Sequence, residues 1–363
     1  MKISPDILSA ENLAVTGTFL LGLCGVLTIA SSQSNSAMPL YLVMKQLCFL
    51  ISGMALLYLG TRIKFTVWQK SAPLLTAAAL LLLCLLPLFG SKINGMTGWF
   101  RLGPLSFQPS ETGRPFFLLA LVILLTKMQD NYMRFLVSGI FILLWIVPVC
   151  LQPDFGTAGI YALGSFIICF LAGMSKKFLA LQVAPCLFAA AAAAAKYPYV
   201  LRRFTGFLSP ERDPLGSGWH VRQFELAIAR GGWSGSKMGG AVWSNAYLPF
   251  SYNDSAGATL LETLGLAGAM MPALLLFILL GSFFVLANRP GLSMQGKLFT
   301  AGTAVFIGLQ MMIHMGINLA LLPPSGLVLP FISYGGSSLA GYCLMTGIVI
   351  SAAKENRQHG SYA

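Results

Sequence analysis

One acidic residue, Asp254, stands where a long polar segment gives way to an apolar one. Residues 196–257 form the only extended break in an otherwise hydrophobic sequence, and Asp254 lies near its end. An ionisable group at a membrane boundary is a functional-site candidate. The break is also basic, because six cations follow Lys196: Arg202, Arg203, Arg212, Arg222, Arg230 and Lys237. The pattern predicts that Asp254 acts on an anionic, lipid-linked substrate held by this basic loop.

The composition predicts a polytopic membrane protein. Of the 363 residues, 56% are hydrophobic and 9% are charged, with a mean hydropathy of +0.76, whereas soluble domains carry about 25% charged residues. The net charge of +12 could indicate nucleic acid, but most cations lie in short loops between apolar segments, as membrane topology requires. The seven cysteines all fall in apolar segments without a CxxC motif, and the three histidines are far apart. We therefore expect no disulfide and no histidine metal site.

The elements that position Asp254 are predicted to be transmembrane helices, so the fold class is all-α. A span needs roughly 20 apolar residues, and ten segments qualify approximately: 13–31, 39–60, 71–90, 110–126, 134–151, 156–173, 178–195, 257–287, 297–322 and 334–353. Residues 1–363 then form a single integral membrane domain. The segment 196–257 is its large extracytoplasmic loop, between helices 7 and 8.

The distribution of cations orients these ten spans. Twelve of the 23 Lys and Arg residues fall at the termini and in alternate loops that share one side of the membrane. Cytoplasmic loops carry such an excess, so both termini are predicted to be cytoplasmic. The basic 196–257 loop is then outside, which phosphate or pyrophosphate binding would explain. The alternative is that a loop of about 60 residues crosses the membrane regardless of its charge.

Three shorter outside segments carry further candidates. Gln108-Pro-Ser-Glu111 opens the fourth span, where Glu111 either caps the helix or pairs with Arg114 three residues later. Gln152-Pro-Asp-Phe-Gly-Thr157 places Asp154 either as a cap of the sixth span or as a functional acid. Residues 323–338 are apolar but rich in Pro and Gly, so we expect an irregular segment packed over protein rather than lipid.

Within the large loop, two kinds of structure are expected. Residues 203–218 are predicted to be extended and rich in turns. Residues 219–230 have helical spacing, with Trp219, Phe224 and Ile228 on about one face. This spacing predicts an amphipathic helix lying on the outer membrane surface.

Taken together, the motifs resemble those of the SEDS proteins, the FtsW, RodA and SpoVE group of bacterial cell-wall polymerases. The resemblance covers nearly the whole chain and follows the family's order of motifs: Lys45-Gln46, Asn94-Gly95, Gln108-Pro-Ser-Glu111, Gln152-Pro-Asp-Phe-Gly-Thr157, Asn253-Asp254, Glu262-x-Leu-Gly265 and Leu329-Pro-Phe-Ile-Ser-Tyr-Gly-Gly-Ser-Ser338. The chain departs from the family at Arg114, where a Lys is usual, and at Ser255-Ala-Gly-Ala, which replaces an apolar stretch. Asn253 before the acid is slightly more typical of the FtsW branch.

The resemblance implies a peptidoglycan glycosyltransferase that polymerises lipid II, an undecaprenyl-pyrophosphate-linked disaccharide peptide, during cell division or elongation. The family's essential acid corresponds to Asp254. The candidate substrate-binding residues are Arg203, Arg212, Arg222, Lys237, Glu111, Arg114, Lys45, Arg101, Glu262 and Ser333. A divalent cation, Mg²⁺ or Mn²⁺, is a candidate cofactor, with no metal ligand assigned among these residues.

The resemblance further implies a location and partners. The protein would lie in the bacterial cytoplasmic membrane with its active site on the outer face. It would act beside a class B penicillin-binding protein and other divisome or elongasome membrane proteins, and not with nucleic acid. Two alternatives to polymerisation stay open, a lipid II flippase using Lys45, Glu111 and Arg114, and a non-catalytic scaffold for the penicillin-binding protein.

Overall fold

Long helices dominate the computed structural model, which describes residues 9–32, 39–93, 95–103, 105–236, 239–248 and 250–360. The helices are α1 (Ala10–Ser32), α2 (Pro39–Arg62), α3 (Phe65–Phe89), α4 (Pro109–Thr112), α5 (Arg114–Lys127), α6 (Asn131–Leu151), α7 (Phe155–Leu171), α8 (Lys176–Lys196), α9 (Pro198–Leu208), α10 (Trp219–Gly231), α11 (Val242–Ala246), α12 (Ala256–Ala287), α13 (Met294–Asn318) and α14 (Gly336–Gly360).

A helix covers each of the ten segments expected to span the membrane, with the fourth divided between α4 and α5. Within the described residues, seven of these helices are long and apolar enough to cross a membrane: α1, α2, α3, α6, α12, α13 and α14. The shorter α7 is also apolar. The prediction of a mostly helical, multi-pass membrane protein is therefore confirmed, while the count of ten spans stays a prediction.

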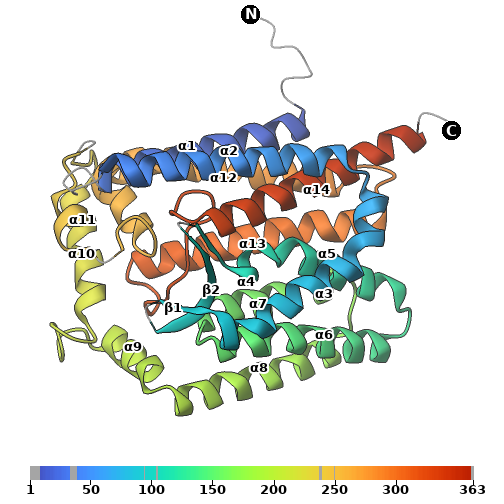
Figure 1. Ribbon diagram of the computed structural model, residues 1–363, viewed down its shortest axis with the longest axis horizontal. Helices are drawn as coiled ribbons and strands as arrows, with labels where there is room; N and C mark the ends of the chain where they lie inside the picture. Colours follow the sequence, from blue (N-terminus) through green and yellow to red (C-terminus); the bar gives the residue numbers. More distant parts are fainter. Residues whose placement is uncertain are drawn as a thin grey trace, which may run out of the picture.

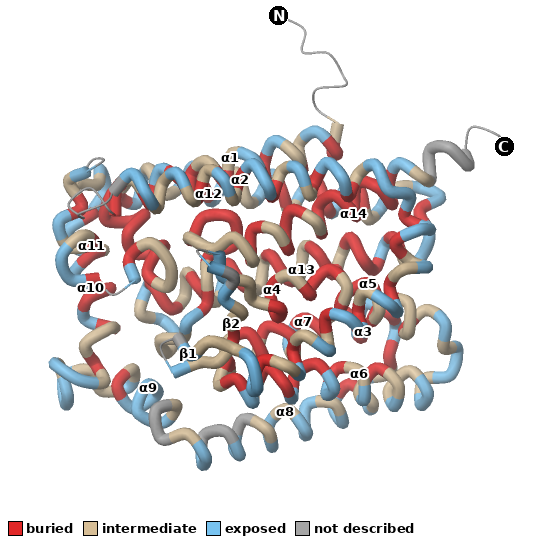
Figure 2. Tube along the Cα trace, in the orientation of Figure 1, coloured by how far each residue is buried: buried red, intermediate tan, exposed pale blue. Residues whose placement is uncertain are grey.

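The long helices lie side by side, and the short helices of the large loop gather at one end of the bundle (Figure 1). The start of α1 and the end of α14 lie at the opposite end. Buried residues concentrate on α13, α14 and the first turns of α12, whereas α6 and α8 keep exposed outer faces (Figure 2). The core is thus built around the helices that flank Asp254.

One small sheet departs from the all-α prediction. Strands β1 (Ser91–Ile93), β2 (Met96–Leu102) and β3 (Leu105–Phe107) form an antiparallel sheet in the order β1-β2-β3. The first turn contains Gly95, which has a φ of 85°, a conformation that favours glycine in tight hairpins. Strand β2 pairs with β1 on one side and with β3 on the other.

The large loop is more helical and more tightly packed than predicted. Residues 203–208 belong to helix α9 rather than to an extended segment, and turns begin only after Leu208. Helix α10 confirms the helix expected at 219–230, but the predicted membrane-surface location is wrong for its main apolar face. Val221, Phe224 and Ala227 are buried, and Gly231 packs against Leu261 of α12. Packing against protein buries this apolar face more completely than a membrane surface would.

Residues 319–335 confirm the irregular, protein-packed segment expected between the last two spans. No helix or strand lies between α13 and α14, a stretch that is fully described. Leu327, Leu329 and Phe331 are buried, and the main chain at Ile332 approaches Gly25 of α1 closely. The segment thereby gains protein contacts that a lipid-facing loop would lack.

The contact between α2 and α14 provides a test of the packing. A Cβ added at Gly347 would lie 2.4 Å from the carbonyl oxygen of Leu57 and 3.0 Å from Cα of Gly60. Gly347→Leu should therefore separate the two helices and destabilise the protein by about 1–3 kcal/mol or more. The measurement is the thermal unfolding midpoint in detergent.

Gly281 of α12 is the matched control, because no atom lies within 4 Å of a Cβ built there. Gly281→Leu should leave the midpoint unchanged. Equal midpoints for both variants would contradict the close packing of α2 and α14.

Candidate active site

A cavity of about 670 Å³ opens where the N-terminus of α7, helix α9 and the segment after α13 meet. Its polar lining includes Asp154, Arg203 and Ser325. The remaining walls are mainly apolar, with Leu201 and Phe204 on α9 among them. A mostly apolar cavity with a few convergent polar groups is the usual form of a ligand site.

Asp254 lies in a turn beside this cavity. The turn is closed by the amides of Asn253 and Ser255, which donate to the carbonyl of Phe250, and Phe250 has a φ of 48°. Oδ2 of Asp254 lies 3.6 Å from the position that a Cβ on Gly326 would occupy. Because Gly326 lines the cavity, the carboxyl group of Asp254 lies next to a residue of the cavity wall, although Asp254 is not itself part of the lining.

Four consecutive main-chain carbonyls hold this turn in place. The carbonyl of Ser251 accepts from Oγ1 of Thr259 at 2.8 Å, and that of Tyr252 from the amide of Tyr334 at 2.8 Å. The carbonyl of Asn253 accepts from Oγ of Ser333 at 2.7 Å, and that of Asp254 from Nδ2 of Asn318 at 3.1 Å. The partners come from α12, α13 and the segment before α14, so three distant parts of the chain fix Asp254.

His314 of α13 contacts α12, the segment before α14 and Asn318. Its Nδ1 lies 2.7 Å from the carbonyl oxygen of Leu327, and its Nε2 lies 3.2 Å from both the amide of Gly257 and Nδ2 of Asn318. Since a carbonyl can only accept, Nδ1 carries the proton and Nε2 accepts. His314 is thus a neutral structural residue, buried completely, and it supports Asn318 at Asp254.

The surroundings of Asp254 raise its pKa towards neutral pH. Burial raises the pKa of Asp254 to about 7, while Arg203 opposes the rise and Asp154 adds to it. Burial likewise raises the pKa of Asp154 to about 6, and the hydrogen bond from the amide of Thr157 opposes that rise. A carboxyl group that titrates near the working pH is suited to general base catalysis.

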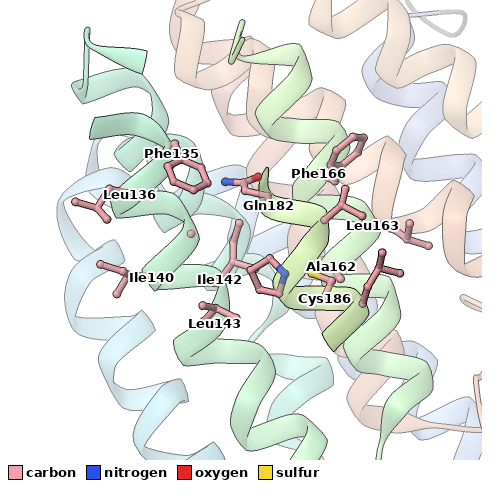
Figure 3. Close-up of a pocket in the computed structure, with 14 residues that line it drawn as sticks. Phe135, Leu136, Ile140, Ile142, Leu143, Ala162, Leu163, Phe166, Gln182 and Cys186 are labelled. Atoms are coloured by element: carbon pink, nitrogen blue, oxygen red, sulfur yellow. The ribbon is translucent and has the colours of Figure 1, made fainter. Parts of the chain in front are cut away.

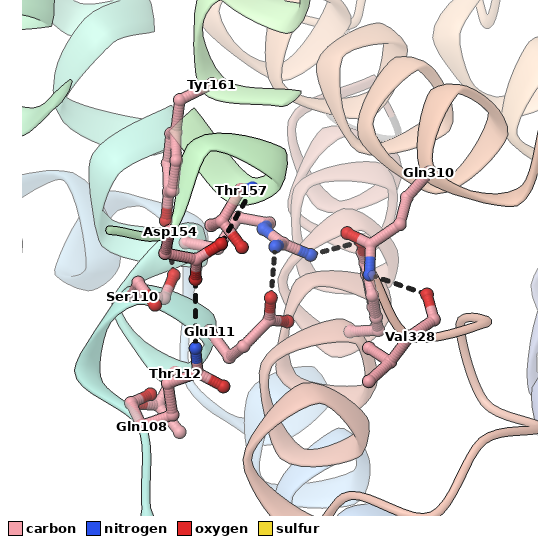
Figure 4. A network of polar contacts seen from close by, with 11 residues as sticks. Gln108, Ser110, Glu111, Thr112, Asp154, Thr157, Tyr161, Gln310 and Val328 are labelled. Atoms are coloured by element: carbon pink, nitrogen blue, oxygen red, sulfur yellow. Dashed lines mark hydrogen bonds and ion pairs between the residues drawn. The ribbon is translucent and has the colours of Figure 1, made fainter. Parts of the chain in front are cut away.

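Glu111 lies in a buried polar network (Figure 4). Glu111 and its partner Arg114 are both buried, and neither lines the cavity. Nη2 of Arg114 pairs with Oε1 of Glu111 at 2.7 Å, and Arg114 also donates to the hydroxyl of Tyr342. That hydroxyl donates to Gln310 at 2.6 Å, and Nε2 of Gln310 donates to the carbonyl of Val328 at 2.9 Å. The expected Glu111–Arg114 pair is present, and through Gln310 it contacts the irregular segment that supports Asp254.

Asp154 has the capping role, one of the two roles that its sequence left open. Its Oδ1 accepts from the amide of Thr157 at 3.1 Å and so caps α7, and its Oδ2 accepts from Nε2 of Gln108 at 3.3 Å (Figure 4). It also lines the cavity, and its other role, that of a functional acid, stays a prediction. Ser325, whose buried Oγ has no hydrogen-bond partner within the described residues, is a cavity residue for which the sequence carried no signal.

Among the other expected cations that lie in the described part of the chain, Arg203 alone is in the cavity lining. Arg212 and Arg222 are exposed, and Arg101 is exposed on β2, paired in register with Ser106. Lys45 lies over the ring of Tyr41, 5.2 Å from its centroid, and beside Tyr334. Lys237 lies outside the described residues.

Two residues that were expected to contact the substrate, Ser333 and Glu262, form hydrogen bonds within the protein instead. Ser333 donates to Asn253 and accepts from the amide of Leu329 at 2.8 Å. Glu262 is completely buried, and its two oxygens accept from the amides of Trp243 and Ser244 at 2.9 and 2.7 Å. These amides belong to the first turn of α11, so Glu262 caps that helix from α12 and ties the large loop to the bundle.

The described residues form no preformed site of three or more ligands for the candidate divalent cation. No group of three or more His, Cys, Asp or Glu residues that could hold a metal occurs in the part of the chain that the structure describes. Magnesium is often bound by one or two carboxylates together with substrate phosphates, and Asp154 and Asp254 could contribute only in that way.

Comparison with known proteins shows which family this chain resembles in sequence. Residues 11–358 match the FtsW, RodA and SpoVE family, described as cell cycle proteins. A probable peptidoglycan glycosyltransferase FtsW of Thioalkalivibrio sulfidiphilus is 36% identical, covering 94% of this chain and 88% of the relative. A second, from Coxiella burnetii, is 33% identical, covering 91% of this chain and 92% of the relative.

Solved structures with the same fold include the rod shape determining protein RodA of Thermus thermophilus, with a TM-score of 0.69 and 26% identity over 94% of this chain and 96% of that one. Another belongs to a peptidoglycan synthase complex studied for its coordination of polymerization and crosslinking. It has a TM-score of 0.78 and 28% identity over 94% of this chain and 98% of that one.

The capping role of Glu262 can be tested through stability. Glu262→Ala removes the acceptor of two amides in α11, and each buried donor left unpaired costs about 1–3 kcal/mol. We expect a thermal unfolding midpoint lower by several degrees. Glu225→Ala on the exposed side of α10 is the control and should leave the midpoint unchanged. A Glu262→Ala protein as stable as the control would show that Glu262 is not a structural anchor.

Proposed function

The chain belongs to the FtsW, RodA and SpoVE family of cell cycle proteins, and from that premise we propose that it is a peptidoglycan glycosyltransferase with its active site in the cavity beside Asp254. The observation that carries the assignment is the position of one carboxyl group, with a pKa of about 7, next to Gly326 in the lining of a cavity that Arg203 also lines. These are the two kinds of group that glycosyl transfer from a pyrophosphate needs.

The proposed reaction joins two lipid II molecules with inversion at the donor sugar. Asp254 takes the proton of the acceptor's 4-hydroxyl as that oxygen bonds to the donor's anomeric carbon. The bond between this carbon and the pyrophosphate oxygen breaks, and polyprenyl pyrophosphate leaves with the electron pair. A general base contributes typically 10²–10⁴-fold to such a step.

Arg203 is proposed to stabilise the pyrophosphate as its negative charge increases. It lies on α9 at the cavity, and its charge reaches Asp254, because it opposes the rise in the pKa of that residue. Arg212 and Arg222, which are exposed and absent from the cavity lining, would meet a substrate only in its approach along the outer loop. If Mg²⁺ or Mn²⁺ participates, substrate phosphates would supply most of its ligands, and no step above depends on it.

The proposed topology has ten spans, with both termini in the cytoplasm and the large loop outside. The cation distribution supports this orientation, as does the arrangement of the bundle, where α9, α10 and α11 lie at the end opposite the start of α1 and the end of α14 (Figure 1). The active site then faces outward, where the glycan is built.

The proposed partner is a class B penicillin-binding protein within the division or elongation machinery. Support comes from the similar chain in a peptidoglycan synthase complex in which polymerization and crosslinking are coordinated. The flippase alternative is less well supported, because Glu111 and Arg114 are buried in a pair with each other and neither lines the cavity.

Removal of the carboxylate tests the assignment directly. Asp254→Ala should lower polymer formation from purified lipid II by at least about 10²-fold, because the acceptor loses its base. Gel analysis of the glycan measures the effect. The unfolding midpoint should not fall, since the main-chain carbonyls rather than the carboxylate hold the turn. Polymer at the wild-type rate would refute Asp254 as the base.

The pH dependence provides an independent test. A base must be deprotonated, so kcat/KM should rise with pH through a midpoint near 7. Arg203→Gln removes a charge that lowers the pKa of Asp254 and should shift the midpoint to higher pH. Asp154→Asn removes a carboxyl that raises it and should shift the midpoint to lower pH. Midpoints that are identical in all three proteins would contradict the assignment.

A further inference from the structure

The two lipid-linked molecules of the proposed reaction carry their pyrophosphates at different distances from the base. The donor is cleaved at the carbon that bears its pyrophosphate, so a cation in the catalytic cavity can serve this molecule. The acceptor reacts instead through the 4-hydroxyl of the sugar that lies farthest from its own pyrophosphate. The acceptor's pyrophosphate therefore needs a second cationic group, separated from Asp254 by the length of a disaccharide.

A further cavity, of about 410 Å³ between α6, α7 and α8, does not supply such a group (Figure 3). Its lining, which lies entirely within the described residues, contains no charged side chain. The amide of Gln182 in this lining donates to Oγ of Ser138 at 3.2 Å. The second cation must lie elsewhere, and Lys45 of α2 is the candidate, because its neighbours contact the turn of Asp254.

Lys45 belongs to a cluster of aromatic side chains. Its Nζ lies 5.2 Å from the ring centroid of Tyr41, and Tyr334 is a second neighbour. The ring centroid of Tyr334 lies 5.8 Å from that of Phe49 on α2 and 5.7 Å from that of Tyr252. We call Lys45 and these four rings the α2 cluster. It joins the outer part of α2 to two segments that are distant in sequence.

The α2 cluster is attached to the turn that carries Asp254. The carbonyl of Tyr252 accepts from the amide of Tyr334 at 2.8 Å, and Tyr252 is separated from Asp254 by at most ~7 Å of extended chain. The cluster residues, all of them described, are absent from the lining of the catalytic cavity. The turn is thus next to the cavity of Arg203 and, separately, next to the cluster of Lys45.

The α2 cluster is accessible to a lipid-linked molecule. Tyr41 and Met44 are 52% and 51% exposed, so the surface of α2 near Lys45 is open. Lys45 follows the start of α2 at Pro39 by ~9 Å along the helix axis, at the end that the proposed topology places outside. A lysine ammonium binds phosphate as a point charge, and tyrosine offers a sugar both an apolar ring and a hydroxyl.

We propose that the α2 cluster is the acceptor subsite, in which Lys45 binds the acceptor's pyrophosphate. The rings of Tyr252 and Tyr334 lie along the acceptor's disaccharide, and its 4-hydroxyl reaches Asp254. This inference rests on the proposed function and divides the two substrates between two cations, with the donor's pyrophosphate at Arg203. Lys45 takes no part in the bond changes and acts by holding the acceptor in position.

Two analogues of lipid II separate the subsites. An analogue without the 4-hydroxyl of the outer sugar can act only as donor, and one with a methylene group in place of the anomeric oxygen can act only as acceptor. Lys45→Gln should raise KM for the acceptor analogue roughly tenfold, because one charge-assisted contact with phosphate is lost. KM for the donor analogue should not change. Lys45→Arg keeps the charge and should restore the acceptor KM to within about threefold of wild type.

Lys92→Gln is the matched control, since it removes the same charge from an exposed lysine on β1 that is absent from the cluster and from the cavity lining. It should leave both KM values unchanged. An unchanged acceptor KM in Lys45→Gln would overturn the proposal. An equal rise for both analogues would also overturn it, because Lys45 would then not distinguish acceptor from donor.

Equilibrium binding separates this inference from the proposed function, because the acceptor analogue binds without turnover. In phosphatidylcholine nanodiscs the wild-type protein should bind two molecules of this analogue, and Lys45→Gln should weaken one of the two sites roughly tenfold. That result would establish the subsite even if no transfer product formed, in which case only the proposed function fails. A single bound molecule in wild type, or loss of the second when phosphatidylglycerol is added, would overturn the subsite.

Discussion

The turn that carries Asp254 is held by its main chain, and the rest of the site depends on that arrangement. The carbonyls of residues 251–254 each accept a hydrogen bond from a different partner, including Thr259, Ser333 and Asn318. Away from water, each carbonyl left unpaired would cost about 1–3 kcal/mol. The position of Asp254 is therefore fixed without using its carboxylate, which lies next to Gly326 of the cavity lining.

The buried ion pair acts on the same turn from a distance. Arg114 pairs with Glu111 and donates to the hydroxyl of Tyr342. Tyr342 donates to Gln310, and Gln310 donates to the carbonyl of Val328. The adjacent Leu327 accepts from His314. A buried pair is weak evidence for stability, because desolvation offsets the attraction between the charges. Its contribution here is better understood as orientation of the segment against which the Asp254 turn packs. Residues of the fourth span thus contact the segment beside Asp254 through other side chains, without lining the cavity.

The sequence predicted those features that depend on local patterns. The length of the apolar segments predicted where the helices lie. The position of Asp254 at the end of a basic loop singled it out, and Arg203 of that loop does influence its pKa. Contacts between distant residues could not be predicted in this way. Glu262 has the pattern of a site acid, but its partners lie about twenty positions earlier, in a five-residue helix that has no periodicity to detect. Likewise, Arg212 and Arg222 have the right charge, but only the path of α9 and α10 decides which cation reaches the cavity.

The most direct test of the account is a structure of the Asp254→Asn protein with lipid II, determined in a lipid bilayer. The account predicts the pyrophosphate at Arg203, with an acceptor 4-hydroxyl within hydrogen-bond reach of the residue-254 side chain. A disaccharide bound outside the cavity, or a pyrophosphate at the opposite end of the bundle, would contradict it.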